Sequence, residues 1–385
     1  MRHAVTGARV AGCMSAAILV VALAGHRAAA YPQFQLSRDQ TCSGCHLSPS
    51  GGGLLSENGE TVAEAGSQLG TAPAFMYGTL PLPGWLALGG DLRGAVGYLR
   101  TPDDTVTGFP MQADLYAHAA AHGFSVQLTA GVRPAQWIPG NGTPSVIDRF
   151  WSREHYVMWQ QDPGGSSGLY VRAGRFLPVF GLRFVEHVDY TRRYGGVPLY
   201  AETYAAAVEY VTPAWEAHLT GFVEDPLIDT VVHDNGAAAY VELRLTPRLA
   251  VGGEAMLAVS GGLATLRGGA TGKLYVPAAD VLVQAELQLV HLQVHGPGAP
   301  NQIVGYVMGS RSFGDAVLLD VGLGHHDENV AIAGLDRDAV DVNLHWFVTS
   351  HLELVLQSRI AGIGLGSSTG GPTSGWALLH AHYRL

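Results

Sequence analysis

The fold is indicated most directly by the stretch Phe124-Ser125-Val126-Gln127-Leu128-Thr129-Ala130-Gly131-Val132-Arg133. Apolar residues alternate along it with polar or small ones, which places the two kinds of side chain on opposite faces of a β-strand. The same period of two returns in the segments 283–289 and 340–347. In a soluble sandwich the apolar faces would meet a second sheet, whereas in a membrane barrel they would meet lipid and the polar faces would line the lumen.

The connections between these segments favour the barrel. Tight turns alternate with longer loops along most of the chain, as periplasmic turns and extracellular loops do in outer-membrane barrels. A longish turn at 162–168 and a short loop at 260–262 depart from this rule. The segments number about 16, and such barrels have an even number of strands. Long loops are expected at 100–110, 134–149, 177–200, 224–236, 294–301, 325–337 and 361–374.

The composition agrees with an exported membrane protein. The formal net charge is -10, only 14% of the residues are charged, and 51 of 385 are glycine. A negative net charge argues against nucleic acid as a partner, because such proteins usually carry a basic patch. Beyond the N-terminal segment there is no apolar run long enough for a transmembrane helix. The chain is therefore expected to cross the membrane with strands.

The first 30 residues are predicted to be a signal peptide that is not part of the fold. A positive start precedes an apolar run from Val10 to Ala24, and small residues at Ala28–Ala30 offer a cleavage site. A lipoprotein box ending at Cys13 is the alternative, but it precedes the apolar run instead of following it. After cleavage the mature chain keeps two cysteines, so no disulfide framework is expected.

Those two cysteines lie in Cys42-Ser43-Gly44-Cys45-His46, the attachment pattern of a c-type haem. Both sulfur atoms would form thioether bonds, and His46 would be the proximal iron ligand. A small disulfide or a stray metal-binding pair is the alternative, yet a zinc site would need further ligands and only His46 is near. Residues 31–84 are expected to form a monohaem cytochrome c-like plug domain with a short helix between Ser56 and Leu69. Residues 85–385 are expected to form the barrel.

The second iron ligand is less defined by the sequence. Met76 lies in the head, where methionine opposite histidine would raise the reduction potential, although an ordinary packing role is the alternative. Histidines of the barrel wall are further candidates, and neutral imidazole is a good ligand for transition metals. Strand parity is expected to direct to the lumen His118, His218, His291, His345, His380 and His382.

The stretch from Phe180 to Tyr194 is the densest in charged and aromatic residues, and it falls in the longest expected loop. In porins such a loop often folds inward, and its charged side chains set selectivity. Its arginines (Arg183, Arg192 and Arg193) are candidates to meet haem propionates or anions. Its other polar residues (Glu186, His187 and Asp189) are candidates to hold a cation. A solvated loop with internal salt bridges is the alternative.

The chain resembles the fused outer-membrane cytochrome–porin family, in which a monohaem c-type cytochrome is joined to a porin-like barrel, as in bacterial ferrous-iron oxidases. The resemblance rests on Ala30-Tyr31-Pro32-Gln33-Phe34 at the family's spacing before Cys42, and on the architecture of the mature chain. The family's next motif is replaced here by Gln35–Asp39, so the resemblance supports electron transfer more strongly than it supports iron as the donor.

The resemblance implies one covalent haem c and an all-β, transmembrane outer-membrane barrel of about 16 antiparallel strands with a small N-terminal plug. It implies electron transfer from an extracellular donor, with Fe(II) as one candidate, to a periplasmic c-type cytochrome or another redox carrier. The hydrocarbon core is about 30 Å thick, so one haem does not bridge it alone and a plugged lumen is favoured.

No nucleophile–base pair or phosphate-binding loop is present among the familiar motifs. The haem would therefore do any chemistry, and the enzymatic activity that the resemblance implies is that of an Fe(II)-oxidising cytochrome. The alternative function is a diffusion porin for small solutes whose head is a structural or regulatory plug. A haem sensor facing the periplasm on a barrel anchor is a third hypothesis.

Overall fold

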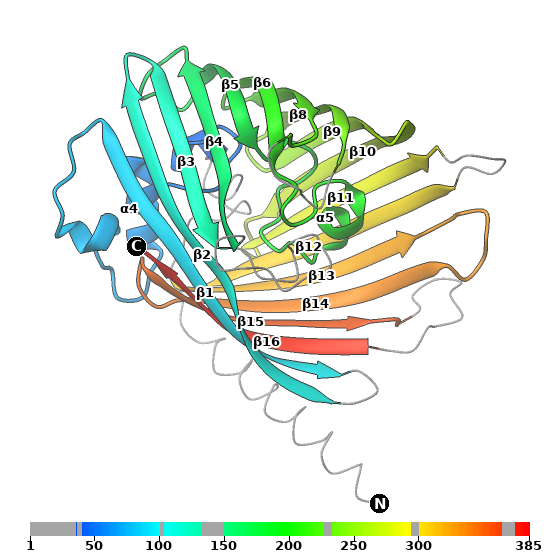
Figure 1. The fold of residues 1–385 in the computed structure, drawn as a ribbon. Helices are drawn as coiled ribbons and strands as arrows, with labels where there is room; N and C mark the ends of the chain where they lie inside the picture. Colours follow the sequence, from blue (N-terminus) through cyan, green and yellow to red (C-terminus); the bar gives the residue numbers. More distant parts are fainter. Residues whose placement is uncertain are drawn as a thin grey trace, which may run out of the picture.

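The computed structural model describes residues 36, 41–100, 104–132, 149–226, 233–293, 300–363 and 374–385. Sixteen antiparallel strands follow one another around a closed barrel, and β16 pairs with β1 to complete it (Figure 1). The predicted all-β barrel and its strand number are confirmed. The predicted signal peptide, its cleavage site and the motif at Ala30–Phe34 lie outside the described residues. No helix in the described part of the chain is both long and apolar enough to span a membrane.

The strands are β1 (Leu86–Arg100), β2 (Thr105–Ala121), β3 (Phe124–Val132), β4 (Phe150–Gln160), β5 (Gly168–Phe176), β6 (Thr203–Val211), β7 (Trp215–Val223), β8 (Asn235–Thr246), β9 (Leu249–Ser260), β10 (Leu263–Val276), β11 (Val281–Leu292), β12 (Asn301–Phe313), β13 (Val317–Asp327), β14 (Asp336–Phe347), β15 (Leu352–Ala361) and β16 (Ser374–Arg384).

The alternation of side chains in β3 shows how the period of two becomes a barrel wall. Val126 and Leu128 point outward and are 52% and 43% exposed, whereas Gln127 and Thr129 point inward and are buried. The same pattern recurs around the wall, so many of the buried side chains are charged or polar. The interior is thus polar and the exterior apolar, which is the reverse of a soluble protein.

The expected loop at 100–110 is wrong, because β1 reaches Arg100 and β2 already begins at Thr105. Gly108 and Pro110 suggested a loop, but both lie within β2. The register between β1 and β2 shifts where Gly94 pairs with Pro110. A bulge accommodates a proline inside a sheet, since proline has no N–H for the ladder. The turn at 162–168 and the short loop at 260–262 agree with expectation.

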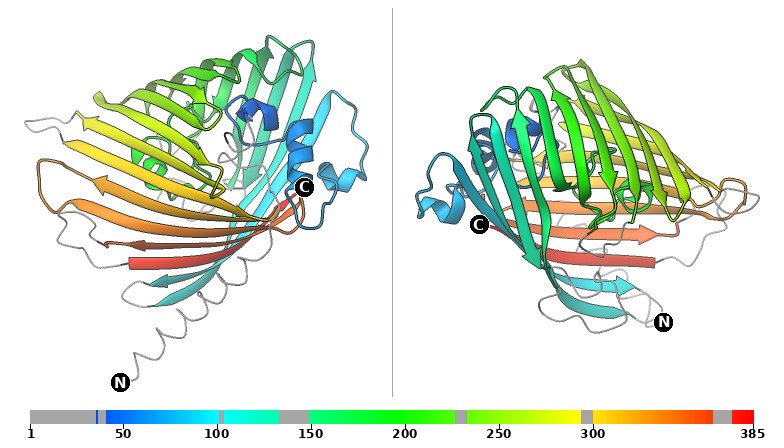
Figure 2. Two further views of the ribbon diagram at one scale, coloured as in Figure 1. Left: turned by 180° about the vertical axis from the view of Figure 1, so that it is seen from behind. Right: turned by 45° about the horizontal axis from the view of Figure 1, so that its top comes forward.

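The N-terminal head lies at the barrel mouth that carries the short turns and the C-terminus (Figure 2). It contains the helices α3 (Cys42–Cys45) and α4 (Glu57–Ala65) and the short 3-10 turn η1 (Phe75–Gly78). Ser56 caps α4, as expected for a helix starting there, because its hydroxyl accepts the Gly59 N–H at 3.1 Å. The helix ends at Ala65 rather than Leu69, since Gly66 is its C-cap.

Several hydrogen bonds join the head to the turn between β14 and β15. The N–H groups of Gln68 and Leu69 donate to the carbonyls of Phe347 and Val348 at 2.9 and 3.2 Å. In addition, the buried His351 ring bonds the carbonyl of Ala72 through Nε2 at 2.8 Å. These contacts hold the head against the barrel rim from a part of the chain far away in sequence.

The segment between β5 and β6 turns into the lumen, as predicted for the longest loop. It contains α5 (Tyr190–Gly195), which packs against β11, β12 and β13 and lies inside the barrel (Figure 1). An apolar cluster fixes it to the wall, with Leu182, Phe184 and Tyr190 on the loop side facing Val304 and Tyr306 of β12. The loop therefore narrows the lumen with a packed element.

Candidate functional site

The cysteine motif is held on a short, well-capped helix. The hydroxyl of Thr41 caps α3 by accepting the Gly44 N–H at 3.0 Å. The neighbouring Ser43 donates from Oγ to the carbonyl of Ser166 at 2.6 Å, in the turn between β4 and β5. That turn is the longish one noted in the sequence, and its extra length carries the residue that anchors the motif. Neither Cys42 nor Cys45 forms a disulfide bond within the described residues.

Helix α4 supports the motif from behind. The Ser56 hydroxyl and the Asn58 amide both donate to the carbonyl of Gly44, at 2.8 and 3.0 Å. The Ser56 N–H donates to the carbonyl of Cys45 at 2.9 Å. A Cβ on Gly59 would lie only 2.0 Å from that same carbonyl oxygen. The two helices thus pack so closely that position 59 has no room for a side chain.

Burial determines the protonation states of the motif. It raises the pKa of the Cys42 and Cys45 thiols, so both are protonated at neutral pH, unlike the thiolates of reactive cysteines. It lowers the pKa of His46 to about 4, so the imidazole is neutral. Neutral imidazole is the form that binds metals. The His46 Nδ1 atom is buried and has no hydrogen-bond partner among the described residues.

Three successive glycines pass over the motif. The φ angles of Gly51, Gly52 and Gly53 are +84°, +79° and +62°, a left-handed region that favours glycine. A Cβ on Gly51 would lie 3.7 Å from Cys42 Sγ and 3.9 Å from His46 Cδ2. The loop therefore lies against the face of the motif that carries these two groups, and it presents backbone there without side chains.

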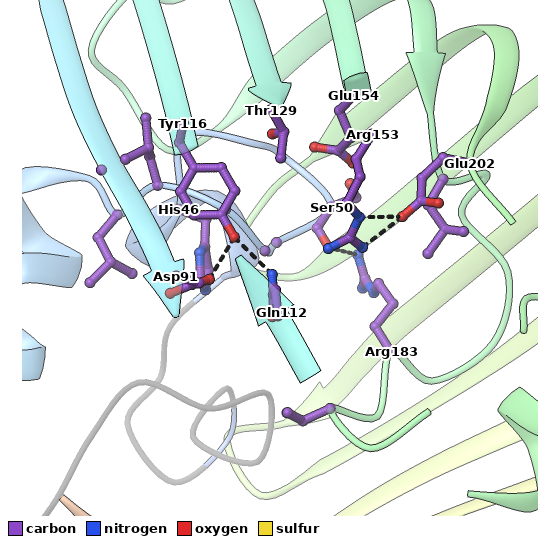
Figure 3. A pocket seen from close by; sticks show the side chains of 18 of the residues that line it. His46, Ser50, Asp91, Gln112, Tyr116, Thr129, Arg153, Glu154, Arg183 and Glu202 are labelled. Carbon is purple, nitrogen blue, oxygen red and sulfur yellow. Dashed lines mark hydrogen bonds and ion pairs between the residues drawn. The ribbon is translucent and has the colours of Figure 1, made fainter. Parts of the chain in front are cut away.

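His46 lines a cavity of about 440 Å³ between the head, the wall and the inward loop. This volume is in the usual range of about 300–1,000 Å³ for ligand sites. Five arginines also line it: Arg93, Arg153, Arg183, Arg192 and Arg384. Figure 3 shows that Arg153 is paired with Glu202, and that Tyr116 bonds both Asp91 and Gln112 in the same cavity. The lining is thus mixed: apolar side chains alternate with acidic groups and with positive groups contributed by four separate parts of the chain.

The predicted second ligands are placed differently by the structure. His187 of the inward loop lines the same cavity as His46, and burial lowers its pKa, so it too is neutral. Met76 is 49% exposed on η1 and does not line this cavity. Two of the three predicted loop arginines line it, whereas the guanidinium of Arg193 lies over the Tyr194 ring. Asp189 is buried near Arg359, away from the cavity lining.

Five of the six wall histidines face the interior and are buried, as predicted. His291 is the exception: it lies on the outward face of β11 and bonds Asn301 through Nδ1 at 2.9 Å. His291 is an even number of residues from Leu287 and Leu289, so it shares their outward face. The prediction that His291 faces the lumen was therefore wrong. The five inward histidines are His118, His218, His345, His380 and His382.

A chain of acids and histidines, not anticipated from the sequence, extends from the cavity along the wall. Asp91 lines the cavity and bonds His382 Nε2 at 2.8 Å. The other ring nitrogen of His382 bonds Glu353 at 3.1 Å, and Glu353 in turn bonds His345 Nδ1 at 2.9 Å. These residues belong to β1, β16, β15 and β14, so their contact depends on the register between strands. The sequence could show that these side chains face the lumen, through their position in the alternating strand pattern. It could not show which of them would be hydrogen-bonded to one another.

The residues present fit a covalently attached haem in their chemistry. The two thiols are unoxidised, His46 is neutral with an unbonded buried nitrogen, and a cavity with cationic side chains adjoins it. Neither cysteine lines that cavity, because the Gly51–Gly53 loop lies against Cys42. A haem bonded to the two sulfur atoms would therefore contact the loop from Gly51 to Gly53. Cys42 and Cys45 would hold the group covalently, and His46 would ligate its iron.

A closed barrel of 16 antiparallel strands with an inward loop is the fold of bacterial porins. No protein-family model and no curated protein matches the chain. Among solved structures, similarity extends to OmpT of Vibrio cholerae with loop L8 deleted (15% identity, TM-score 0.57, 78% of this chain and 99% of that chain). An anion-selective porin from Comamonas acidovorans is similar at 13% identity and TM-score 0.57, over 78% and 99% of the two chains. OprB of Pseudomonas putida is similar at 12% identity and TM-score 0.57, over 78% and 94%. At these identities the likeness concerns the fold.

Proposed function

We propose that this chain is an outer-membrane, porin-like barrel whose N-terminal head carries one covalent haem c and transfers electrons between an extracellular donor and a periplasmic carrier. The location is supported by the fold and by the apolar outer face, since Leu219, Leu289 and Leu379 are 59%, 60% and 58% exposed. Outer-membrane lipid would cover that face. The short turns mark the periplasmic mouth in such barrels, so the head would face the periplasm.

The observation that carries the haem assignment is the arrangement of Cys42, Cys45 and His46 at a capped helix, with His46 lining a cavity of mixed apolar and charged side chains. A bound haem c would supply reversible one-electron chemistry at its iron. The chain would supply two sulfur atoms for attachment and a neutral imidazole for ligation. Arg183 and Arg192 would offer positive charge to carboxylates such as propionates, because both line the cavity.

His187 is the better of the two candidates for a second ligand, since it lines the cavity with His46 whereas Met76 does not. The visible spectra of the His187→Ala and Met76→Leu variants test the two candidates. Loss of a protein ligand would change the spin state of the iron, whereas an unrelated substitution would leave the visible spectrum unchanged.

The position of the head determines which partners are within reach. A periplasmic c-type cytochrome or another redox carrier would dock at the head, because this mouth is the one with short turns. The donor would approach through the opposite mouth, where the inward loop narrows the path. Fe(II) is supported as donor by the family resemblance alone, since the described residues contain no group of three or more His, Cys, Asp or Glu side chains arranged for a metal.

The deciding experiment is the intact mass and visible spectrum of the purified protein. We expect the mass of the mature polypeptide plus one haem, and reduced haem bands after dithionite. Cys42→Ala and Cys45→Ala should each abolish two-bond attachment, whereas Ser48→Ala, next to the same motif, should leave it intact. Two free thiols and no added mass would overturn the proposal. Bands that grow with dithionite but not with ferrous iron would remove iron as the donor.

A diffusion porin is the second candidate, and the similarity to solved porins favours it specifically. The polar interior is suited to solute passage. Single-channel conductance in planar bilayers separates the two functions. A steady open conductance with a haem-free head would support the porin, whereas a nearly closed channel with a haem-loaded head would support the plugged electron conduit.

A further inference from the structure

A second polar cluster lies in the lumen, beneath the start of the inward loop, and the proposed function does not use it. It centres on Glu254 of β9 and Glu286 of β11, which are 7% and 3% exposed. A Cβ on Gly181 would lie 2.4 Å from Glu286 Oε1 and 3.1 Å from Glu254 Oε2, so both carboxylates converge on this glycine. Between the two strands, β10 presents Gly269, and a Cβ there would lie 2.5 Å from Glu254 Oε1. The missing side chain leaves Glu254 free to extend toward β11.

The cluster contains more hydrogen-bond acceptors than donors. Glu286 accepts the Leu182 N–H at 2.8 Å and a short hydrogen bond from the Gln288 amide. By contrast, the oxygens of Glu254 meet no well-aligned donor in the described part of the chain, although Gln288 and Glu286 lie beside them. Gln288 Oε1, on a side chain with no exposed surface, has no well-aligned donor there either. The hydroxyl of Thr191 on α5, which is 2% exposed, lies beside the carboxylate of Glu286. Buried acceptors without partners are costly, so the cluster is incomplete as it stands.

A shared proton does not complete it. One proton between Glu254 and Glu286 would satisfy one oxygen of each carboxyl group. The other oxygen of Glu254 and the carbonyl of Gln288 would still lack a donor. Within the described ranges neither Glu254 nor Glu286 forms a salt bridge with a lysine or an arginine. What the cluster lacks is a positive group that several oxygens can approach together.

We propose that Glu254, Glu286 and Gln288 bind a calcium ion that ties the barrel wall to the inward loop, with Thr191 as a further ligand. Carboxylate, amide and hydroxyl oxygens are the ligands of calcium, which accepts irregular sets of about six to eight of them. Magnesium fits less well, because it requires a near-ideal octahedron and retains water. The proposed site has only two carboxylates, and its other ligands are neutral oxygens. It is therefore compatible with the finding that the described residues contain no group of three or more His, Cys, Asp or Glu side chains arranged for a metal. This site goes beyond the proposed electron transfer and does not depend on a haem.

The test is calcium binding by the full-length protein purified in detergent, treated with EDTA and dialysed against radioactive calcium. We expect one calcium per chain for the wild type, and at least about a tenfold weaker affinity for Glu254→Gln, since loss of even an outer-shell partner costs about 10–100-fold. The variant should fold, because a glutamine amide can donate to Glu286. Glu328→Gln is the matched control, because the exposed Glu328 carboxylate pairs with Arg337 at the barrel mouth opposite the head. This variant should bind calcium as the wild type does.

A second readout is cleavage by trypsin after Arg192 and Arg193, which calcium should slow in the wild type but not in Glu254→Gln. Calcium binding of equal strength in the wild type and Glu254→Gln, or none in the wild type between pH 6 and pH 8, would overturn the proposal. Equal protection by magnesium would overturn the choice of calcium. A pH-dependent cleavage that calcium leaves unchanged and Glu254→Gln abolishes would identify a shared proton instead, and would also overturn it.

Discussion

Replacing Gly59 by alanine tests how closely α4 must pack on the motif from Cys42 to His46. The new Cβ would lie 2.0 Å from the carbonyl oxygen of Cys45 and 2.8 Å from its carbonyl carbon, both backbone atoms that cannot swing away. Overpacking of this kind costs about 1–3 kcal/mol. Alanine should recover up to about 1 kcal/mol through its higher helix propensity. The net effect is a loosening of the α3–α4 contact by about 1–2 kcal/mol.

The assay is hydrogen exchange by mass spectrometry on peptides that cover α3 and α4. A loss of about 1–2 kcal/mol should lower protection of these amides about 5–30-fold. Gly84→Ala is the control, because no atom lies within 4 Å of its added Cβ. If Gly59→Ala raised protection of α4, as helix propensity alone predicts, the close packing deduced from the structure would be refuted.

Three further predictions concern the head and the inward loop. Gly51→Ala and Gly52→Ala place alanine at nearly equal left-handed φ angles of +84° and +79°, yet only Gly51→Ala brings a methyl group within 4 Å of Cys42 Sγ and His46. Gly51→Ala should therefore lower the haem content, measured by gel staining, more than Gly52→Ala does. Equal losses in the two variants would contradict this. Burial raises the pKa of Asp189 well above its ordinary value, so the folded loop binds this proton more tightly than the unfolded loop, and loop stability should fall as pH rises above the carboxyl's ordinary range. Asp189→Asn should abolish that fall in hydrogen exchange of α5, and an unchanged pH profile would contradict it. His351→Phe removes a buried ring whose nitrogens lie 2.7 and 2.8 Å from the carbonyls of Arg384 and Ala72. A neutral imidazole donates one N–H to such acceptors, so head docking should weaken by about 1–2 kcal/mol. Trp346→Phe loses one exposed bond to Gln68 and should cost less than about 1 kcal/mol, and trypsin cleavage of the head measures both losses.

The period of two in stretches such as 124–132 predicted the facing of most side chains, because strand geometry repeats strictly. Together with the alternation of tight turns and long loops it also predicted the barrel and its strand number. The start of α4 was predictable from its Ser56 cap, which is a local interaction. The hairpin at 100–110 was not, since Pro110 ordinarily ends a strand and the bulge that admits it depends on pairing with β1. The outward position of His291 agrees with its parity, which it shares with Leu287 and Leu289, so the prediction was wrong because strand parity was misapplied at this residue.

The candidate site divides in the same way. The Cys-x-x-Cys-His spacing is local and is visible in one dimension. The cavity beside His46, the chain from Asp91 through His382 to Glu353, and the cluster at Glu254 each join residues of separate strands. Their partners follow from register and from the path of the inward loop. The periodicity of a single strand reveals neither its register with neighbouring strands nor the path of the inward loop.

The bonds that seat the head have a consequence for biogenesis. Ser43 contacts Ser166, and Gln68, Leu69 and Ala72 contact residues between 347 and 351, so the head docks in part on a turn that comes late in the sequence. Contacts so distant in sequence form late. The amino-terminal segment should therefore hang loose in the periplasm until the final strands insert. During that interval the cysteines would be open to the enzymes that attach porphyrins, and assembly of the cylinder would then close this access.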